Sequence, residues 1–279
     1  MDYLELTIEL QPRDPWAEVL VAELSELGFE SFVDTDKGIQ AYAPAREGIS
    51  EQLLAETSLS DNPDVQVSVT SALIPHQNWN AKWEADFEPV EVDSRLVILA
   101  PFHDAAAFPG REQIIIQPQM SFGTGHHQTT YLMSQYLLDM EEMPAKVLDM
   151  GTGTGVLAIL AEKKGAEDIL AVDIEPWSVE NTDENAGRNH CTKIRTLTGD
   201  IDSVTDRGFG LIVANINKNV LKNHLPHYYE ALSGGGLLLL SGFFVSDVPE
   251  LTELAGQLGF GHVQTLEKET WAALKLIRK

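Results

Sequence analysis

A glycine-rich turn flanked by two carboxylates carries the strongest chemical signal in the sequence. Asp149 is followed by Gly151, Gly153 and Gly155, and Asp173 comes at the end of the next predicted strand. Glycines in such a turn let the backbone approach a ligand closely, and a carboxylate after the next strand can accept hydrogen bonds from ribose hydroxyls. The pattern therefore predicts a nucleotide-like ligand at a strand–turn–helix junction.

The details of this turn distinguish between two kinds of nucleotide. A dinucleotide fingerprint, Gly-x-Gly-x-x-Gly, would place its third glycine at position 156, where the sequence has Val156. A pyrophosphate is bound by backbone N–H groups at a helix N-terminus, and a neighbouring carboxylate such as Asp149 would oppose it. S-adenosylmethionine carries a sulfonium and an amino group and has no phosphate, so the turn favours this methyl donor over NAD.

The ends of the next two strands offer further contacts for the donor. Asp173 would bind the ribose hydroxyls, and Ile174 would lie against the adenine ring. Asp200 could accept a hydrogen bond from the adenine amino group, with Ile201 beside it. The alternative for either aspartate is a helix N-cap or a solvated loop carboxylate.

A second segment that could contact the donor lies upstream of the turn. Phe122, Thr124 and Gly125 belong to a loop in which two glycines flank a hydroxyl side chain, and the N–H groups of such a loop can meet a carboxylate. We expect Thr129 or Thr130 to cap the helix that follows. An ordinary loop with a capped helix is the alternative.

Asn215 follows the apolar residues 211–214 and is the candidate for orienting the amine that accepts the methyl group. An ammonium has no lone pair, and deprotonating a free lysine at neutral pH costs about 4.6 kcal/mol. A partly desolvated site lowers this cost, and an amide oxygen can align the nitrogen with the methyl group. A strand-end asparagine that only makes a turn is the alternative.

The sequence gives less evidence for a metal site or a reactive cysteine than for a donor site. His126 and His127 are adjacent, and His224 and His227 could share a helix face. No cysteine cluster or His-Glu-x-x-His motif accompanies them, so we expect no metal site. Cys191 is the only cysteine, which is consistent with a reducing cytoplasm and with the absence of an intrachain disulfide.

The chain of 279 residues is strongly acidic, with a formal net charge of −24. Residues 1–100 hold 20 Asp and Glu against 5 Lys and Arg. Such a protein should repel bare nucleic acid and could attract a basic protein, with a generally acidic surface as the alternative. We find no apolar run of about 18 residues and no signal peptide, so we expect a cytoplasmic protein without a membrane span. We also expect a monomer, since nothing indicates an obligate assembly.

The elements that must position these residues divide the chain into three parts. Residues 1–73 show strands and helices in the order βαββαβ, which matches a small ferredoxin-like α+β domain. Residues 74–100 form a connector with a predicted helix around Trp79 and Trp83. Residues 101–279 alternate strands and helices, which predicts an α/β fold with a doubly wound parallel sheet and one antiparallel strand near its end.

Two helix predictions concern the last third of the chain. Pro226 should interrupt the helix that contains it, because proline lacks the backbone N–H group. Asp247 and Glu250 have the spacing of a capping box and should begin another helix.

Two motifs together support a family resemblance that covers essentially the whole chain. Residues 122–130 read Phe-Gly-Thr-Gly-His-His-Gln-Thr-Thr, and residues 147–159 read Val-Leu-Asp-Met-Gly-Thr-Gly-Thr-Gly-Val-Leu-Ala-Ile. With the small N-terminal domain and the tryptophan-containing connector, the sequence resembles the ribosomal protein L11 methyltransferase family. The residues that depart from the usual family pattern are Ser121, His126, Thr152 and Thr154.

This resemblance implies a class I S-adenosylmethionine-dependent fold and methylation of lysine side chains and the N-terminal amine of ribosomal protein L11, with the N-terminal domain recognising the substrate. It also implies that residues 122–127, Gly151, Asp173 and Asp200 hold the donor, and that Asn215 lies beside the reacting nitrogen. A class I methyltransferase acting on another protein, an RNA or a small-molecule amine is the alternative within this fold. A donor-binding scaffold without catalysis is the third possibility.

Overall fold

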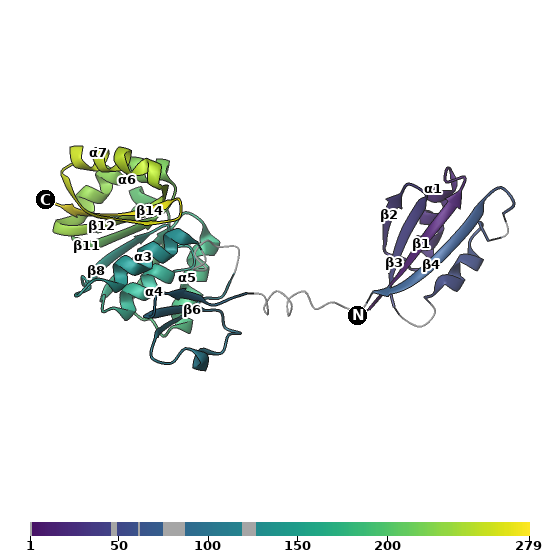
Figure 1. The fold of residues 1–279 in the computed structure, drawn as a ribbon, viewed down its shortest axis with the longest axis horizontal. Coiled ribbons are helices and arrows are strands. Elements are labelled where there is room, and N and C mark those ends of the chain that lie inside the picture. The colour runs from purple at the N-terminus through teal and green to yellow at the C-terminus, as the bar shows by residue number, and fades with distance from the viewer. Residues whose placement is uncertain (1, 46–48, 61, 75–86, 119–126) are drawn as a thin grey trace. The chain divides into compact units, whose positions relative to one another are not determined.

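The structure, a computed structural model, describes residues 2–45, 49–60, 62–74, 87–118 and 127–279. The chain forms two compact units, Met1–Asp86 and Phe87–Lys279 (Figure 1). The first unit has one sheet and the second has two, and each unit has its own apolar core. The predicted helix around Trp79 and Trp83 lies outside the described residues.

The first unit contains a four-stranded antiparallel sheet with the strand order β2-β3-β1-β4. Alternation along β1 places Leu6 and Ile8 on one face, where they are buried with Leu20 and Leu24 of α1. The second helical segment, η1, is a short 3-10 helix. The elements are β1 (Tyr3–Gln11), α1 (Trp16–Glu26), β2 (Ser31–Thr35), β3 (Gly38–Pro44), η1 (Glu51–Glu56) and β4 (Gln66–Ile74).

The second unit is built on a seven-stranded sheet with the order β10-β9-β8-β11-β12-β14-β13. All neighbours run parallel except at β14, which is antiparallel to both β12 and β13. The predicted doubly wound α/β sheet with one antiparallel strand is therefore confirmed. Its strand order reverses between β8 and β11, and ligands bind at the carboxyl ends of strands at such a point. The strands are β8 (Lys146–Met150), β9 (Asp168–Asp173), β10 (Ile194–Thr198), β11 (Phe209–Asn215), β12 (Leu232–Phe244), β13 (Phe260–Lys268) and β14 (Trp271–Arg278).

Helices cover both faces of this sheet (Figure 1). Apolar side chains alternate along the strands, so that one set packs with α3 and α4 and the other with α6 and α7. None of the helices in the described part of the chain is long and apolar enough to cross a membrane. The helices are α3 (Gln128–Leu138), α4 (Val156–Lys163), α5 (Pro176–Arg188), α6 (Lys218–Ala231) and α7 (Val248–Gln257), with short 3-10 turns at η2 (Ala105–Ala107), η3 (Ile201–Ser203) and η4 (Val245–Asp247).

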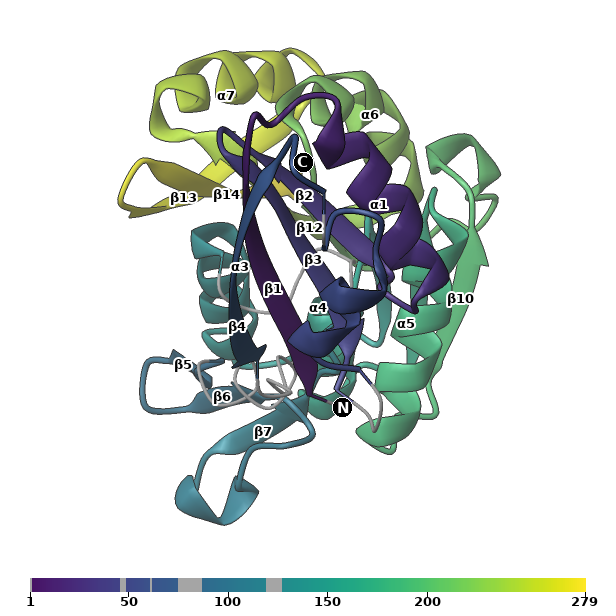
Figure 2. The ribbon, with the colours of Figure 1, turned by 90° about the vertical axis from the view of Figure 1, so that its right-hand side faces the viewer.

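A small three-stranded sheet also belongs to the second unit and is visible at the lower left of Figure 2. It joins β5 (Val90–Val92), β6 (Leu96–Leu99) and β7 (Glu112–Ile115). Strand β6 is antiparallel to β5 and parallel to β7, and its Leu96 and Ile98 pack into the same apolar cluster as α3. The latter part of the segment assigned from sequence to a connector is thus integral to this unit.

Three helix ends or interruptions differ from the sequence-based expectations. Helix α6 runs through Pro226 without a break, although the proline removes one helical N–H donor. Helix α3 is capped by His127, whose ring accepts a hydrogen bond from the N–H of Thr129, and neither threonine caps it. Asp247 precedes α7, but its carboxylate accepts from the N–H of Phe244 and pairs with Lys218 instead of capping the helix.

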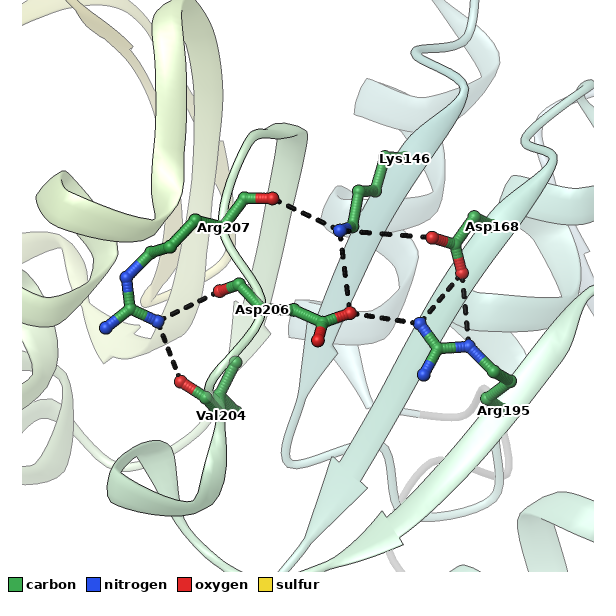
Figure 3. A network of polar contacts seen from close by, with 6 residues as sticks. All are labelled: Lys146, Asp168, Arg195, Val204, Asp206 and Arg207. Carbon is green, nitrogen blue, oxygen red and sulfur yellow. Dashed lines mark hydrogen bonds and ion pairs between the residues drawn. The ribbon is translucent and has the colours of Figure 1, made fainter.

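The amino-terminal ends of β8, β9 and β10 are joined by a charged network (Figure 3). Arg195 contacts Asp168 and Asp206 at 2.9 and 3.1 Å, and Lys146 contacts Asp206 at 3.5 Å. These side chains are partly exposed, so each pair contributes little stability. The network lies at the amino-terminal ends of these strands, away from the carboxyl ends where ligands bind in such sheets.

Candidate functional site

A pocket opens at the carboxyl ends of the central strands of the second unit. It lies where β8, β9 and β11 end, and its walls also include parts of α3, α5, α6, β12 and β14. Its composition is mainly apolar with a few polar groups, as is usual for small-molecule sites. The lining residues are His127, Thr129, Met150, Gly151, Gly153, Asp173, Ile174, Glu175, Trp177, Ser178, Asn215, Ile216, Asn217, Val220, His224, Gly242 and Trp271.

The structure brings together part of the predicted donor site. The predicted residues that line the pocket are Gly151, Gly153, Asp173, Ile174 and Asn215. Those described by the structure but located away from its lining are Asp149, Asp200 and Ile201. Those outside the described residues are Phe122, Thr124 and Gly125.

The glycine turn after β8 is held against the end of β9. The N–H groups of Gly151 and Thr152 donate to the carbonyl of Val172 at 2.8 and 3.0 Å. Gly151 and Gly153 have φ angles of +75° and +57°, which side-chain-bearing residues rarely adopt. The sequence therefore needs glycine here both for the turn and for an open backbone surface on the pocket wall.

Asp173 occupies the predicted place at the end of β9 and is 9% exposed. Its carboxylate accepts from the N–H of Gly153 at 2.9 Å and from the N–H of Glu175 at 3.0 Å. These bonds tie the glycine turn to the start of α5 and fix the direction of the carboxylate. An ionised carboxylate has further lone pairs, so Asp173 retains acceptors for hydroxyl groups in the pocket.

Asp149 lies beneath the turn and is only 2% exposed. The Thr152 hydroxyl donates to its carboxylate at 2.8 Å, and the Ala158 N–H also hydrogen-bonds to it. Burial raises the pKa of Asp149 to about 7, despite these hydrogen bonds. Asp149 is therefore not an anion that faces the ligand, as the sequence suggests, because its side chain supports the turn from inside.

Replacing Asp149 with asparagine should change how stability depends on pH. The folded protein holds the Asp149 proton more tightly than the unfolded chain, whose pKa is near 3.8, so this contribution is complete below that value and is lost as the pH rises to about 7. The asparagine side chain of the variant does not titrate. The stability of Asp149→Asn relative to the wild type should therefore rise by roughly 2 to 3 kcal/mol between about pH 5 and about pH 8.

Denaturant unfolding of both proteins at the two pH values measures this difference. Glu141→Gln removes an exposed carboxylate from the same unit and controls for the general effect of charge. A pH-independent difference between Asp149→Asn and the wild type would contradict a strongly raised pKa.

Asp200 and Ile201 take structural roles. The Asp200 carboxylate accepts from the N–H of Asp202 at 3.1 Å and caps η3, which is the alternative that the sequence left open. Ile201 is buried in the cluster beneath α6 and α7. Both residues hold the loop after β10 in place, and their contact with the adenine ring stays a prediction.

The pocket is also lined by three residues that the sequence did not assign to the donor site, Trp177, Val220 and His224. Trp177 of α5 is 53% exposed, Ile174 is 64% exposed, and both side chains line the pocket. Val220 and His224 of α6 also line the pocket, four residues apart on one helix face. Burial lowers the pKa of His224, which favours its neutral form. Such a surface suits a flat, uncharged ring.

Asn215 ends β11 and reaches the other side of the pocket. Its Nδ2 group lies 3.5 Å from the Thr130 hydroxyl of α3, a long hydrogen bond. Its Oδ1 atom is buried and has no hydrogen-bond partner among the described residues. A buried acceptor without a partner is costly, so it marks a position where a ligand N–H group would be stabilising.

One aromatic residue that the sequence did not single out, Trp271, also lines the pocket. The Trp271 ring lies 4.4 Å from the ring of Phe244 and 4.5 Å from that of His127. Burial lowers the pKa of His127, so its ring stays neutral at higher acidity. Trp271 begins the antiparallel β14, and only the sheet order brings it to the pocket that Asn215 also lines.

The described residues fit S-adenosylmethionine. The glycine turn provides close backbone approach, Asp173 provides ribose acceptors, and Ile174 with its neighbours provides an apolar wall. Asn215 lines the same pocket and offers a neutral amide next to the donor's place. A pocket of this kind at the switch point of a doubly wound sheet defines a class I S-adenosylmethionine-dependent methyltransferase.

Within this class, the chain belongs to the family described as ribosomal protein L11 methyltransferase (PrmA), whose profile matches residues 15–279. The ribosomal protein L11 methyltransferase of Porphyromonas gingivalis is 42% identical over 273 residues, covering 97% of this chain and 92% of that protein. The protein of the same name from Phocaeicola vulgatus is 39% identical over 289 residues and covers 100% of both chains. A crystal structure of a ribosomal protein L11 methylase from Lactobacillus delbrueckii subsp. bulgaricus matches with a TM-score of 0.64 at 29% identity, covering 69% of this chain and 100% of that chain.

Proposed function

We propose that this enzyme transfers methyl groups from S-adenosylmethionine to amines of ribosomal protein L11, on lysine side chains and at the N-terminal amine. One observation carries the proposal. A single pocket is lined by the glycine turn and Asp173 and also by Asn215, the residue that follows the apolar end of β11. The choice of L11 is supported by the relatives, which are named as methyltransferases of that protein. The reaction is proposed to take place in the cytoplasm, with the enzyme as a monomer.

The residues of the pocket can prepare an amine for this reaction. When bound, S-adenosylmethionine supplies an electrophilic methyl group on a sulfonium. Ile216 and Trp271 give the pocket apolar walls, which disfavour the charged form of an entering amine. The Asn215 oxygen can accept one N–H of the neutral amine and so direct its lone pair. Because Asn215 is uncharged, it does not hold the amine in its ammonium form as a carboxylate would.

Incubation of the enzyme with purified L11 and isotope-labelled S-adenosylmethionine tests the proposal. Mass spectrometry of digested L11 should show added methyl groups on lysine-containing peptides or on the N-terminal peptide. Parallel reactions with ribosomal RNA and with small amines separate the alternatives. Label in either of these, with none in L11, would overturn the proposed substrate.

Recognition of a basic protein is supported by the charge of the first unit. Residues 1–86 hold 17 acidic against 4 basic side chains, and many of the described carboxylates are exposed. A concentration of like charge accelerates encounter with an oppositely charged partner and repels nucleic acid. We propose that L11 makes its first contacts with this acidic unit.

Reversing charge on the first unit should slow this encounter. Glu18, Glu26, Asp36 and Glu56 are exposed, and replacing all four with lysine should lower the association rate constant for L11 about tenfold at low ionic strength. The effect should shrink as salt is added, because screening removes long-range attraction. Stopped-flow fluorescence with labelled L11 at several salt concentrations measures it.

A matched variant separates local recognition from total charge. Glu141, Glu142, Glu230 and Glu253 are exposed on the second unit, and four lysine substitutions there change the net charge by the same amount. An equal slowing by both quadruple variants would show that only the total charge matters.

A further inference from the structure

Ile216 is inserted between the ends of three neighbouring strands. It follows Asn215 at the end of β11, and its side chain lines the pocket. A Cβ atom added to Gly151, after β8, would lie 2.1 Å from the Ile216 Cγ2 methyl. The glycine turn and the Ile216 side chain are therefore in direct contact, and no larger residue fits at Gly151 while Ile216 keeps its place.

The backbone of Ile216 makes a second close contact, with β12 on the other side. Its N–H donates to the Ser241 carbonyl at 3.1 Å. A Cβ atom added to Gly242 would lie 2.2 Å from the Ile216 carbonyl oxygen, and Gly242 has a φ angle of +97°. The pairing of β12 with β14 shifts register between Ser241 and Phe243, so Gly242 forms a bulge that makes room for Ile216.

We propose that Ile216 is a positioning residue for methyl transfer. Its side chain rests on the donor's glycine turn while its backbone is held by β12, so the preceding residue, Asn215, keeps one placement relative to the donor. The inference rests on the proposed function and extends it to a residue that does not itself bind the amine through a polar group. A displacement of about 1 Å in such a site costs on the order of 100-fold in rate.

Two substitutions of Ile216 separate the effect of side-chain shape from the effect of side-chain volume. Ile216→Leu keeps the side-chain volume and removes the branch at Cβ that carries the contacting methyl, whereas Ile216→Val keeps that branch and is smaller. Ile216→Leu should lower kcat for L11 by about 10- to 100-fold, and Ile216→Val should lower it less. Binding of S-adenosylhomocysteine, measured by calorimetry, should change little in either variant.

Substitutions of both Gly151 and Ile216 test the contact between them in an experiment that does not need L11. Gly151→Ala should weaken S-adenosylhomocysteine binding, because the new methyl collides with Ile216. Adding Ile216→Ala removes the Cγ2 methyl and leaves the Ile216 Cβ atom 3.6 Å away, an ordinary contact distance. The double variant should therefore bind about tenfold more tightly than Gly151→Ala alone, a coupling expected only for residues in contact.

Gly235→Ala provides the matched control for the backbone. Gly235 has a φ of +77°, close to that of Gly151, and no described atom lies within 4 Å of an added Cβ. The Gly235→Ala variant shows the effect of placing alanine at a positive φ angle without a collision. Thermal unfolding shows whether each variant is folded.

The results distinguish failure of the positioning role from failure of the proposed function. Strictly additive effects of Gly151→Ala and Ile216→Ala on donor affinity, or equal turnover in Ile216→Leu and Ile216→Val, would overturn the positioning role. A wild-type enzyme that binds no S-adenosylhomocysteine would overturn the proposed function instead.

Discussion

An Asp173→Ala variant should bind S-adenosylmethionine at least about 100-fold more weakly than the wild type. The carboxylate is nearly buried at the pocket wall, with its direction set by the N–H groups of Gly153 and Glu175. Two ribose hydroxyls would each donate a charge-assisted hydrogen bond to it, and each such bond contributes about 1.5 to 3 kcal/mol. Calorimetric titration with S-adenosylhomocysteine measures the loss directly.

Two further variants make this result specific. Asp168→Ala removes a carboxylate from the opposite end of the same strand, where it pairs with Arg195 and Lys146 (Figure 3), and should leave donor affinity unchanged. Asp173→Asn keeps one oxygen acceptor without the charge and should fall between alanine and the wild type. A folded Asp173→Ala protein with wild-type affinity would remove Asp173 from the donor site.

An Asn215→Ala variant should show the complementary behaviour. Its turnover of L11 should fall by about 100-fold or more, because the amine loses the acceptor that orients it. Donor affinity should stay close to that of the wild type, since Asp173 and the glycine turn are untouched. Single-turnover kinetics, combined with calorimetry on the same preparation, separates the two effects.

An aspartate at the same position tests the chemical reason. In Asn215→Asp, a carboxylate beside the amine would stabilise the ammonium and raise its pKa. The acid limb of the pH–rate profile should therefore move to higher pH. Loss of donor affinity in Asn215→Ala, with turnover at saturating donor unchanged, would reverse the roles given to Asn215 and Asp173.

The main features of the catalytic fold follow from patterns that are local in sequence. The apolar run at residues 211–214 and the glycine turn at Gly151 identify strand ends, and the two closing segments predict one antiparallel strand, as the structure shows. The expectation that α6 breaks at Pro226 is wrong, because a propensity rule takes no account of packing. Leu221, Leu225 and Tyr228 are buried against the sheet and hold the helix together across the proline.

The candidate site was less predictable, because its residues come from strands that are adjacent only in the sheet. Asp173 and Asn215 follow strands of recognisable type, so their places could be expected. Trp271 and Gly242 have no local signal, since their contribution depends on β14 lying next to β12. Asp149 shows a second limit, because its position in the sequence did not reveal that its side chain points into the protein.

The position of β14 has a consequence for synthesis on the ribosome. Translation proceeds from the N-terminus, so β14 leaves the ribosome after every other strand of the seven-stranded sheet, yet it lies inside that sheet between β12 and β13. A nascent chain that lacks β14 has no Trp271 at the pocket and leaves one edge of β12 open to pairing with other chains. Protection from aggregation and completion of the pocket are thus reached together, when the last strand is inserted.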